Sequence, residues 1–270
     1  MINSKTILFP NNIEIERVKV PGSFELKNHS HSNFHLCVVL EGSFEEITNS
    51  EVVECKKQTV RISKPSAEHE IYFGSDGGEC IIIQLNERFA NVNNPWFHFN
   101  EDSFYNFYSS YISDFFNNKN INDISPSTLE IVLRKFLASC LSNNNELREP
   151  DWLKEVKYFI DSNPSFSFDS SEIAEKVGIH RVHLSRTFSK LMGCTLQEYI
   201  ILKKLETAHS FLNESDLNIS SVAYEAGFAD HSHFNKIFRK YFNTNPQSYK
   251  SKLLSGTHVT NVQANFSPAD

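Results

Sequence analysis

The sequence lacks the features that mark most membrane-spanning and secreted proteins. No apolar run approaches the ~18 residues that could cross a bilayer, and the opening MINSKTILFPNN has no small-residue cleavage site. We therefore expect a cytoplasmic protein with no membrane partner. The cysteines are scattered without a C-x-x-C pair, which argues against a disulfide framework and a structural zinc site. They are Cys37, Cys55, Cys80, Cys140 and Cys194.

Common enzyme motifs and an excess of basic charge are missing as well. The chain has no Gly-rich phosphate loop, G-x-S-x-G elbow or H-E-x-x-H helix. Its formal net charge is −7, but residues 151–252 hold 13 Lys and Arg against 12 Asp and Glu, whereas residues 1–150 hold 13 against 20. A nucleic-acid partner of the second half would therefore bind through individually placed cations and helix N-termini.

The first third of the chain consists of short runs rich in β-branched and aromatic residues. Turn-forming residues such as Pro21-Gly22, Glu41-Gly42 and Gly77-Gly78 separate these runs. Many short strands at this spacing predict a β-sandwich or barrel. The runs are IEIERVKV, FHLCVVL, FEEI, TVRI, HEIYF and ECIIIQL.

Helical periodicity replaces this pattern after Trp96. Apolar residues repeat at helical spacing over 104–115 and again over 129–141, which predicts two amphipathic helices. The Asn-rich segment after them ends at Pro150 and is typical of an interdomain linker. The two helices either cover the sandwich or form a homodimer interface, and we favour the interface.

The last third contains two similar helix-turn-helix patterns. In the second, Asp230 can cap a helix whose Phe234 and Phe238 share one face, after a short helix broken at Gly227. The first, with a capping box of Asp169 and Glu172, repeats it at an offset of 49 to 50 residues. The apolar residues of a helix over 196–212 are expected to pack on both units and set their spacing.

The second unit resembles the pattern of the AraC/XylS family of transcription regulators. The resemblance covers roughly residues 151–252, and Asn243 stands where that family usually has Gly. It implies an all-α domain with two helix-turn-helix units that binds double-stranded promoter DNA. The matching residues are Ala223, Gly227, Phe228, Asp230, Ser232, Phe234, Phe238, Asn243, Pro246 and Tyr249.

Several outward-facing residues of this domain are candidates for DNA contact. In the first unit these are Val182, Ser185 and Arg186, of which Arg186 could donate to both acceptors of a guanine. In the second unit the resemblance implies His231, Ser232, Asn235 and Lys236. Lys203, Lys204, Arg239 and Lys240 are phosphate candidates, although for any one of them a solvated helix face is the simpler explanation.

Four histidines stand out in the β-rich segment. His29, His31 and His35 lie around the beginning of one strand and His69 precedes another, an arrangement that resembles the cupin jelly roll used as a sensor by many AraC/XylS regulators. His35 occupies the place where metal cupins usually carry Glu. The cluster is either a metal site or part of an effector pocket. We favour the pocket, with no metal and no cofactor.

These patterns together predict an α+β multidomain protein. We expect a cupin-like effector domain over 1–98, a helical linker and dimerisation segment over 99–150, the DNA-binding domain over 151–252 and a flexible tail over 253–270. The predicted function is a homodimeric transcription regulator, not an enzyme, controlled by an unidentified small molecule and able to contact RNA polymerase. The alternatives are a metal-dependent cupin enzyme and an architectural DNA-binding protein without effector.

Overall fold

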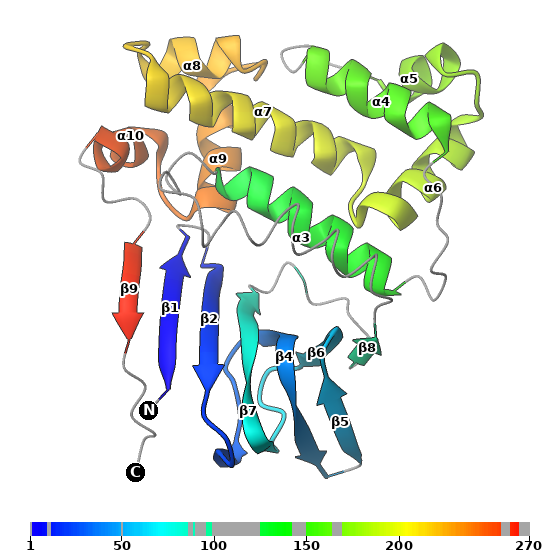
Figure 1. Ribbon diagram of the computed structural model, residues 1–270. Helices are drawn as coiled ribbons and strands as arrows, with labels where there is room; N and C mark the ends of the chain where they lie inside the picture. The colour runs from blue at the N-terminus through cyan, green and yellow to red at the C-terminus, as the bar shows by residue number, and fades with distance from the viewer. Residues whose placement is uncertain are drawn as a thin grey trace. The chain divides into compact units, whose positions relative to one another are not determined.

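The structure is a computed structural model of the chain (Figure 1), and it describes residues 2–9, 12–49, 51–85, 89, 96–98, 125–141, 150–163, 169–254 and 260–264. The chain divides into two compact units. The first comprises Met1–Asn118 and Val259–Asp270, and the second comprises Lys119–His258. The helix expected over 104–115 lies outside the described residues.

The first unit is built on one antiparallel sheet, ordered β8-β6-β4-β7-β2-β1-β9, with β3 paired to β7 and β5 to β4. An N-terminal antiparallel β unit followed by helices confirms the predicted α+β class. The strands are β1 (Asn3–Leu8), β2 (Glu14–Val20), β3 (Glu25–His29), β4 (Phe34–Thr48), β5 (Val52–Lys56), β6 (Thr59–Ser63), β7 (His69–Leu85), β8 (Trp96–His98) and β9 (Thr260–Ala264).

The two longest strands, β4 and β7, pair with each other from end to end, and their register shifts on both sides of Gly42. Such bulges bend a strand and increase its twist. Gly42 has a φ of +74°, and a Cβ on it would lie 2.1 Å from the carbonyl oxygen of Gly77. Only glycine fits this position. The bent sheet therefore encloses the side chains of its inner face.

The second unit is helical and contains both helix-turn-helix pairs, α5–α6 and α8–α9. Gly178 and Gly227, with φ of +68° and +79°, form the two turns. The predicted caps are present, because Asp169 and Glu172 form a capping box and Asp230 accepts from the backbone N–H of His233. The helices are α3 (Pro126–Leu141), α4 (Asp151–Ser162), α5 (Ser170–Lys176), α6 (Arg181–Met192), α7 (Leu196–Glu214), α8 (Ile219–Glu225), α9 (His231–Phe242) and α10 (Pro246–Leu254).

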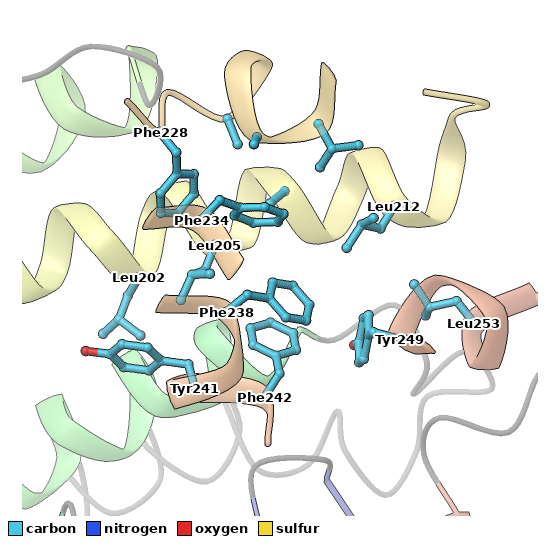
Figure 2. Close-up of a cluster of buried hydrophobic side chains, with 14 residues drawn as sticks. Leu202, Leu205, Leu212, Phe228, Phe234, Phe238, Tyr241, Phe242, Tyr249 and Leu253 are labelled. Carbon is cyan, nitrogen blue, oxygen red and sulfur yellow. The ribbon is translucent and has the colours of Figure 1, made fainter. Parts of the chain in front are cut away.

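Helix α7 joins two hydrophobic cores, as its sequence predicts. Its first turns pack through Leu196 and Ile200 against α4, α5 and α6. Its later turns pack through Leu205 and Leu212 against the second helix-turn-helix unit. Figure 2 shows aromatic side chains of α9, among them Phe234 and Phe238, beside Leu205. One continuous helix therefore fixes the spacing of the two helix-turn-helix units.

Two parts of the chain differ from the sequence-based domain boundaries. Helix α3, expected in a linker, packs on α6 and α7 of the second unit, and Thr128 donates to the carboxylate of Glu206 on α7 at 3.0 Å. The segment Thr260–Ala264, expected to be a flexible tail, forms β9 and pairs with β1. Both elements are held in position by tertiary contacts with segments distant in the sequence. Among the described helices, none combines the length and apolarity needed to span a membrane.

Candidate DNA-binding surface and ligand cavity

Helix α6 presents a polar face opposite its core residues. Leu184 and Phe188 are fully buried, which follows from their i, i+4 spacing. Val182, Ser185 and Arg186 are exposed on the other side of the helix. The structure therefore brings together the three residues of this unit that the sequence proposes for base contact. The His180 side chain accepts from the N–H of Val182 and caps the helix.

Helix α9 carries the equivalent face of the second unit. His231, Ser232 and Lys236 are exposed, whereas Asn235 is half-buried. The side-chain amide of Asn235 donates to the backbone carbonyl of His231 at 3.1 Å, so one donor is already used. The residues around Asn235 form a shallow concavity. Its lining consists of Ile219, His231, Ser232, Asn235, Lys236, Arg239, Asn245 and Gln247.

Asn245 and Gln247 belong to this concavity but are absent from the sequence-based candidates. Asn245 accepts from the N–H of Ser248 at 2.8 Å and so begins α10. The Asn-Pro pair at 245–246 marks a turn before a helix, which explains the cap. Gln247 faces the same concavity because of the way α10 packs on α9. No local sequence pattern predicts this packing.

A cavity of about 270 Å³ lies within the first unit. All four predicted histidines line it: the rings of His31 and His35 stack with centroids 3.8 Å apart, and those of His29 and His69 lie 4.2 Å apart. The rest of the lining is mostly apolar and aromatic. It includes Val18, Val20, Phe24, Leu26, Cys37, Phe44, Ile71, Phe73, Cys80 and Ile82.

The histidine side chains are poor bases in this environment. Burial, with the nearby His69 ring, lowers the pKa of His29 to about 4 and that of His31 to about 4. Burial also holds the pKa of His35 well below its usual value. These three imidazoles are therefore uncharged at neutral pH. Both ring nitrogens of His29 and the Nε2 of His31 are buried without a hydrogen-bond partner in the described structure.

Three of the histidines could also hold a metal ion. One ring nitrogen from each of His29, His31 and His69 lies within 4.8 Å of the others. The Nδ1 of His69 is 3.0 Å from the carbonyl oxygen of Ala67, which leaves its Nε2 for a ligand. Neutral nitrogen donors of this kind suit a divalent transition metal. The geometry therefore permits either of the two roles weighed from the sequence.

The polar lining of the cavity also includes carboxylates that the sequence analysis did not select. Glu14 and Glu16 on β2 face the cavity. Burial raises the pKa of Glu14, and the carboxylate of Glu16 adds to that effect. Deeper in the sheet, Glu46 forms an ion pair with Arg61, whose guanidinium also lies 3.4 Å from Glu51.

Comparison with known proteins identifies the second unit. A family model described as a helix-turn-helix domain matches residues 173–252. The chain is 36% identical over 109 residues to the probable transcription factor PqrA of Proteus vulgaris, an alignment that covers 40% of this chain and 88% of PqrA. The chain belongs to the AraC family of transcription regulators. It is a sequence-specific DNA-binding regulator of transcription.

Several further relatives of this AraC-family regulator share a smaller fraction of identical residues with it. It is 23% identical over 266 residues to the uncharacterized HTH-type transcriptional regulator YfiF of Bacillus subtilis, covering 88% of this chain and 82% of YfiF. Several other curated regulators are matched over only 29–45% of their own length. Among solved structures, unsaturated fatty acid-bound ToxT from Vibrio cholerae aligns with a TM-score of 0.38 and 14% identity, over 95% of this chain and 96% of ToxT.

Two lysines expected at DNA phosphates have partners inside the AraC-family domain. The Nζ of Lys203 lies 2.6 Å from Glu206 and 3.4 Å from Asp161 on α4. Lys204 donates to the carbonyl oxygen of Gly227 at 2.5 Å, and burial lowers its pKa. Both side chains therefore hold α7 to neighbouring elements, and their contact with DNA phosphates stays a prediction. The sequence pattern places them on α7 but does not show which neighbours they meet.

Arg239 and Lys240 keep the exposure that a phosphate contact requires. They lie in the last turn of α9 and are exposed. Arg239 also lines the concavity around Asn235, whereas the Nζ of Lys240 lies 5.4 Å from the ring centroid of Tyr241. A cation at the C-terminal end of a helix is stabilised by the helix dipole, so both positions are favourable even without DNA.

Proposed function

We propose that this regulator is controlled by a small-molecule effector that binds in the cavity of the first unit. The observation that carries the proposal is the cavity itself, which has apolar walls and a group of convergent polar side chains. That combination is typical of small-molecule sites. An architectural DNA-binding protein would have no need of an internal cavity, and it is the less favoured alternative.

On the DNA side, we propose that α6 supplies most of the base contacts. Arg186 has the guanidinium that can donate to both guanine acceptors, and Val182 has a side chain suited to a thymine methyl group. On α9, Asn235 is proposed at an adenine and Lys236 at a guanine or a phosphate. Ser185, His231 and Ser232 complete the proposed contacts to DNA, and Arg239 and Lys240 those to phosphate.

A cavity-filling variant tests the effector proposal. The Ile82 side chain lines the cavity, so Ile82→Trp should abolish an effector-dependent change in DNA affinity and leave basal binding intact. The DNA site for this assay would be selected from a random duplex pool with the purified protein. Val52, which is 64% exposed, gives the matched control Val52→Trp. An unchanged effector response in Ile82→Trp would contradict the proposal.

We propose further that the protein acts as a homodimer that contacts RNA polymerase and has no enzymatic activity. Relatives described as transcription regulators support the non-enzymatic role. Of the two helices predicted to form the interface, α3 has Leu133 and Leu137 buried within the chain, so we propose the other predicted helix, over 104–115, as the interface. Sedimentation with and without DNA tests the dimer. Stoichiometric tightly bound metal and chelator-sensitive turnover would instead favour the metal-dependent enzyme.

A further inference from the structure

The inner face of β2 changes from acidic to apolar along its length. Its cavity-facing residues are, in order, Glu14, Glu16, Val18 and Val20, because alternate residues of a strand share a face. Val18 and Val20 pack with partly buried Phe24, Phe73 and Ile82. The wall of the cavity is therefore amphiphilic, with two carboxylates at one end and an aromatic surface at the other.

Glu16 is buried to an extent that is unusual for a carboxylate, with only 7% of its surface exposed. Its register neighbours are Thr6 on β1 and Ile82 on β7, and those of Glu14 are Leu8 and Gln84. None of these is a cation. The part of the chain that the structure describes gives neither glutamate an ion pair.

The remaining titratable groups of the cavity do not neutralise these glutamates. Arg61 is shared by Glu46 and Glu51. The rings of the four cavity histidines contact one another, and in the described residues none of them forms an ion pair with Glu14 or Glu16. No lysine occurs among the described residues that line the cavity. Two formal negative charges are thus left in a largely enclosed space, where an unpaired charge is costly.

A bound cation would remove this cost and would also use the aromatic wall. An ammonium group pairs with carboxylates and is attracted to aromatic ring faces. We propose that the effector is a small organic cation, with an amine or ammonium group at Glu14 and Glu16 and an apolar body against Phe24 and Phe73. This inference rests on the proposed effector role of the cavity, and it supplies the chemical class of the effector.

Three probes of equal chain length test the charge preference of the cavity: octylamine, 1-octanol and octanoate. Titration calorimetry on the full chain should show one octylamine site, at least ~10-fold tighter than that for octanol, and no saturable site for octanoate. A tenfold difference corresponds to 1.4 kcal/mol. Equal or tighter binding of octanol or octanoate would overturn the cation assignment, and so would the absence of any octylamine site.

Variants locate the site within the cavity. Glu16→Gln and Glu14→Gln should each weaken octylamine binding by ~10-fold or more, whereas Glu54→Gln on the exposed side of β5 should leave it unchanged. Equal effects of all three variants would contradict the inference. Because Gln is nearly isosteric with Glu, the folded state should survive, and the thermal transition of each variant checks this.

The inference and the effector proposal can fail separately. If octanol or octanoate binds instead, and Ile82→Trp blocks that binding, the cavity remains an effector site of another chemical class. If no probe binds, the cation assignment fails. If in addition Ile82→Trp leaves the effector-dependent change in DNA affinity intact, the effector role of the cavity fails as well.

Discussion

At the scale of single residues, Arg186 offers the clearest test of sequence recognition. Its exposed guanidinium lies on α6 beside Val182 and Ser185. Arg186→Ala should weaken binding to the selected site by about 1–3 kcal/mol and relax the preference at one base position. Fluorescence anisotropy with specific and random duplexes measures both effects. Lys154→Ala on α4 is the control, and an equal loss on both duplexes would assign Arg186 to a phosphate.

Glu14 provides a second test, based on its raised pKa. Burial and the neighbouring Glu16 disfavour the charged form, so the folded state binds this proton more tightly than the unfolded state does. The protonated Glu14 carboxyl therefore contributes stability at low pH. This contribution is lost as the pH rises through the pKa of Glu14 in the folded state. Glu14→Gln should therefore raise the melting temperature at pH 7. The gain in melting temperature should fall as the pH is lowered and should vanish below pH 4.5, the ordinary pKa of a glutamate. A gain independent of pH would refute this explanation.

At the scale of elements, substitutions at two equivalent residues test how closely α3 packs against the end of α6. Gly193 and Asn243 both end a recognition helix in the left-handed conformation, with φ of +67° and +51°. A Cβ on Gly193 would lie only 2.2 Å from the carbonyl oxygen of Arg134 on α3.

Gly193→Asn should therefore destabilise the protein by about 1–3 kcal/mol, the usual cost of forcing atoms into a packed site. The backbone conformation is not the cause, because Asn tolerates it at position 243. The reciprocal change Asn243→Gly should alter the free energy of unfolding by less than about 1 kcal/mol. Urea denaturation of both variants compares these energies, and equal effects would mean that α3 does not restrain Gly193.

The elements that sequence patterns predict are those stabilised locally. The two helix-turn-helix pairs have caps, turns and apolar spacing within short segments, so their repeat is visible in the sequence. Helix α3 is predicted from its periodicity, but its partners α6 and α7 are distant in the sequence. Strand β9 has no distinctive pattern, and its place depends on the free edge of β1.

The residues of the candidate cavity site likewise include some that the sequence predicts and some that it does not. The histidines were grouped correctly in space because their spacing resembles a known pattern. Glu14 and Glu16 were missed, because a charged residue alternating with Ile13 and Ile15 normally indicates the solvent face of a strand. Here both faces of β2 are covered: Ile13 and Ile15 are fully buried on one face, and the glutamates face the cavity on the other.

At the scale of the whole molecule, the position of α3 changes which fragment should fold independently. Ile131 of α3 packs against both hydrophobic cores of the second unit. A fragment of residues 119–258 should therefore unfold in one cooperative transition and bind DNA. A fragment of residues 151–258 should be less stable. Thermal denaturation and DNA titration of both fragments check this, and equal stability would show that α3 contributes nothing to the unit.

The pairing of β9 with β1 has a consequence for synthesis on the ribosome. Thr260 follows Leu85, the last residue of β7, by 175 residues, which at about 5–20 residues per second is a delay of roughly 9–35 s. During this interval the nascent sheet exposes the edge of β1, which can pair with another chain. A polysome therefore carries several such chains side by side, and β9 protects the β1 edge of each chain only after its second unit has been synthesised.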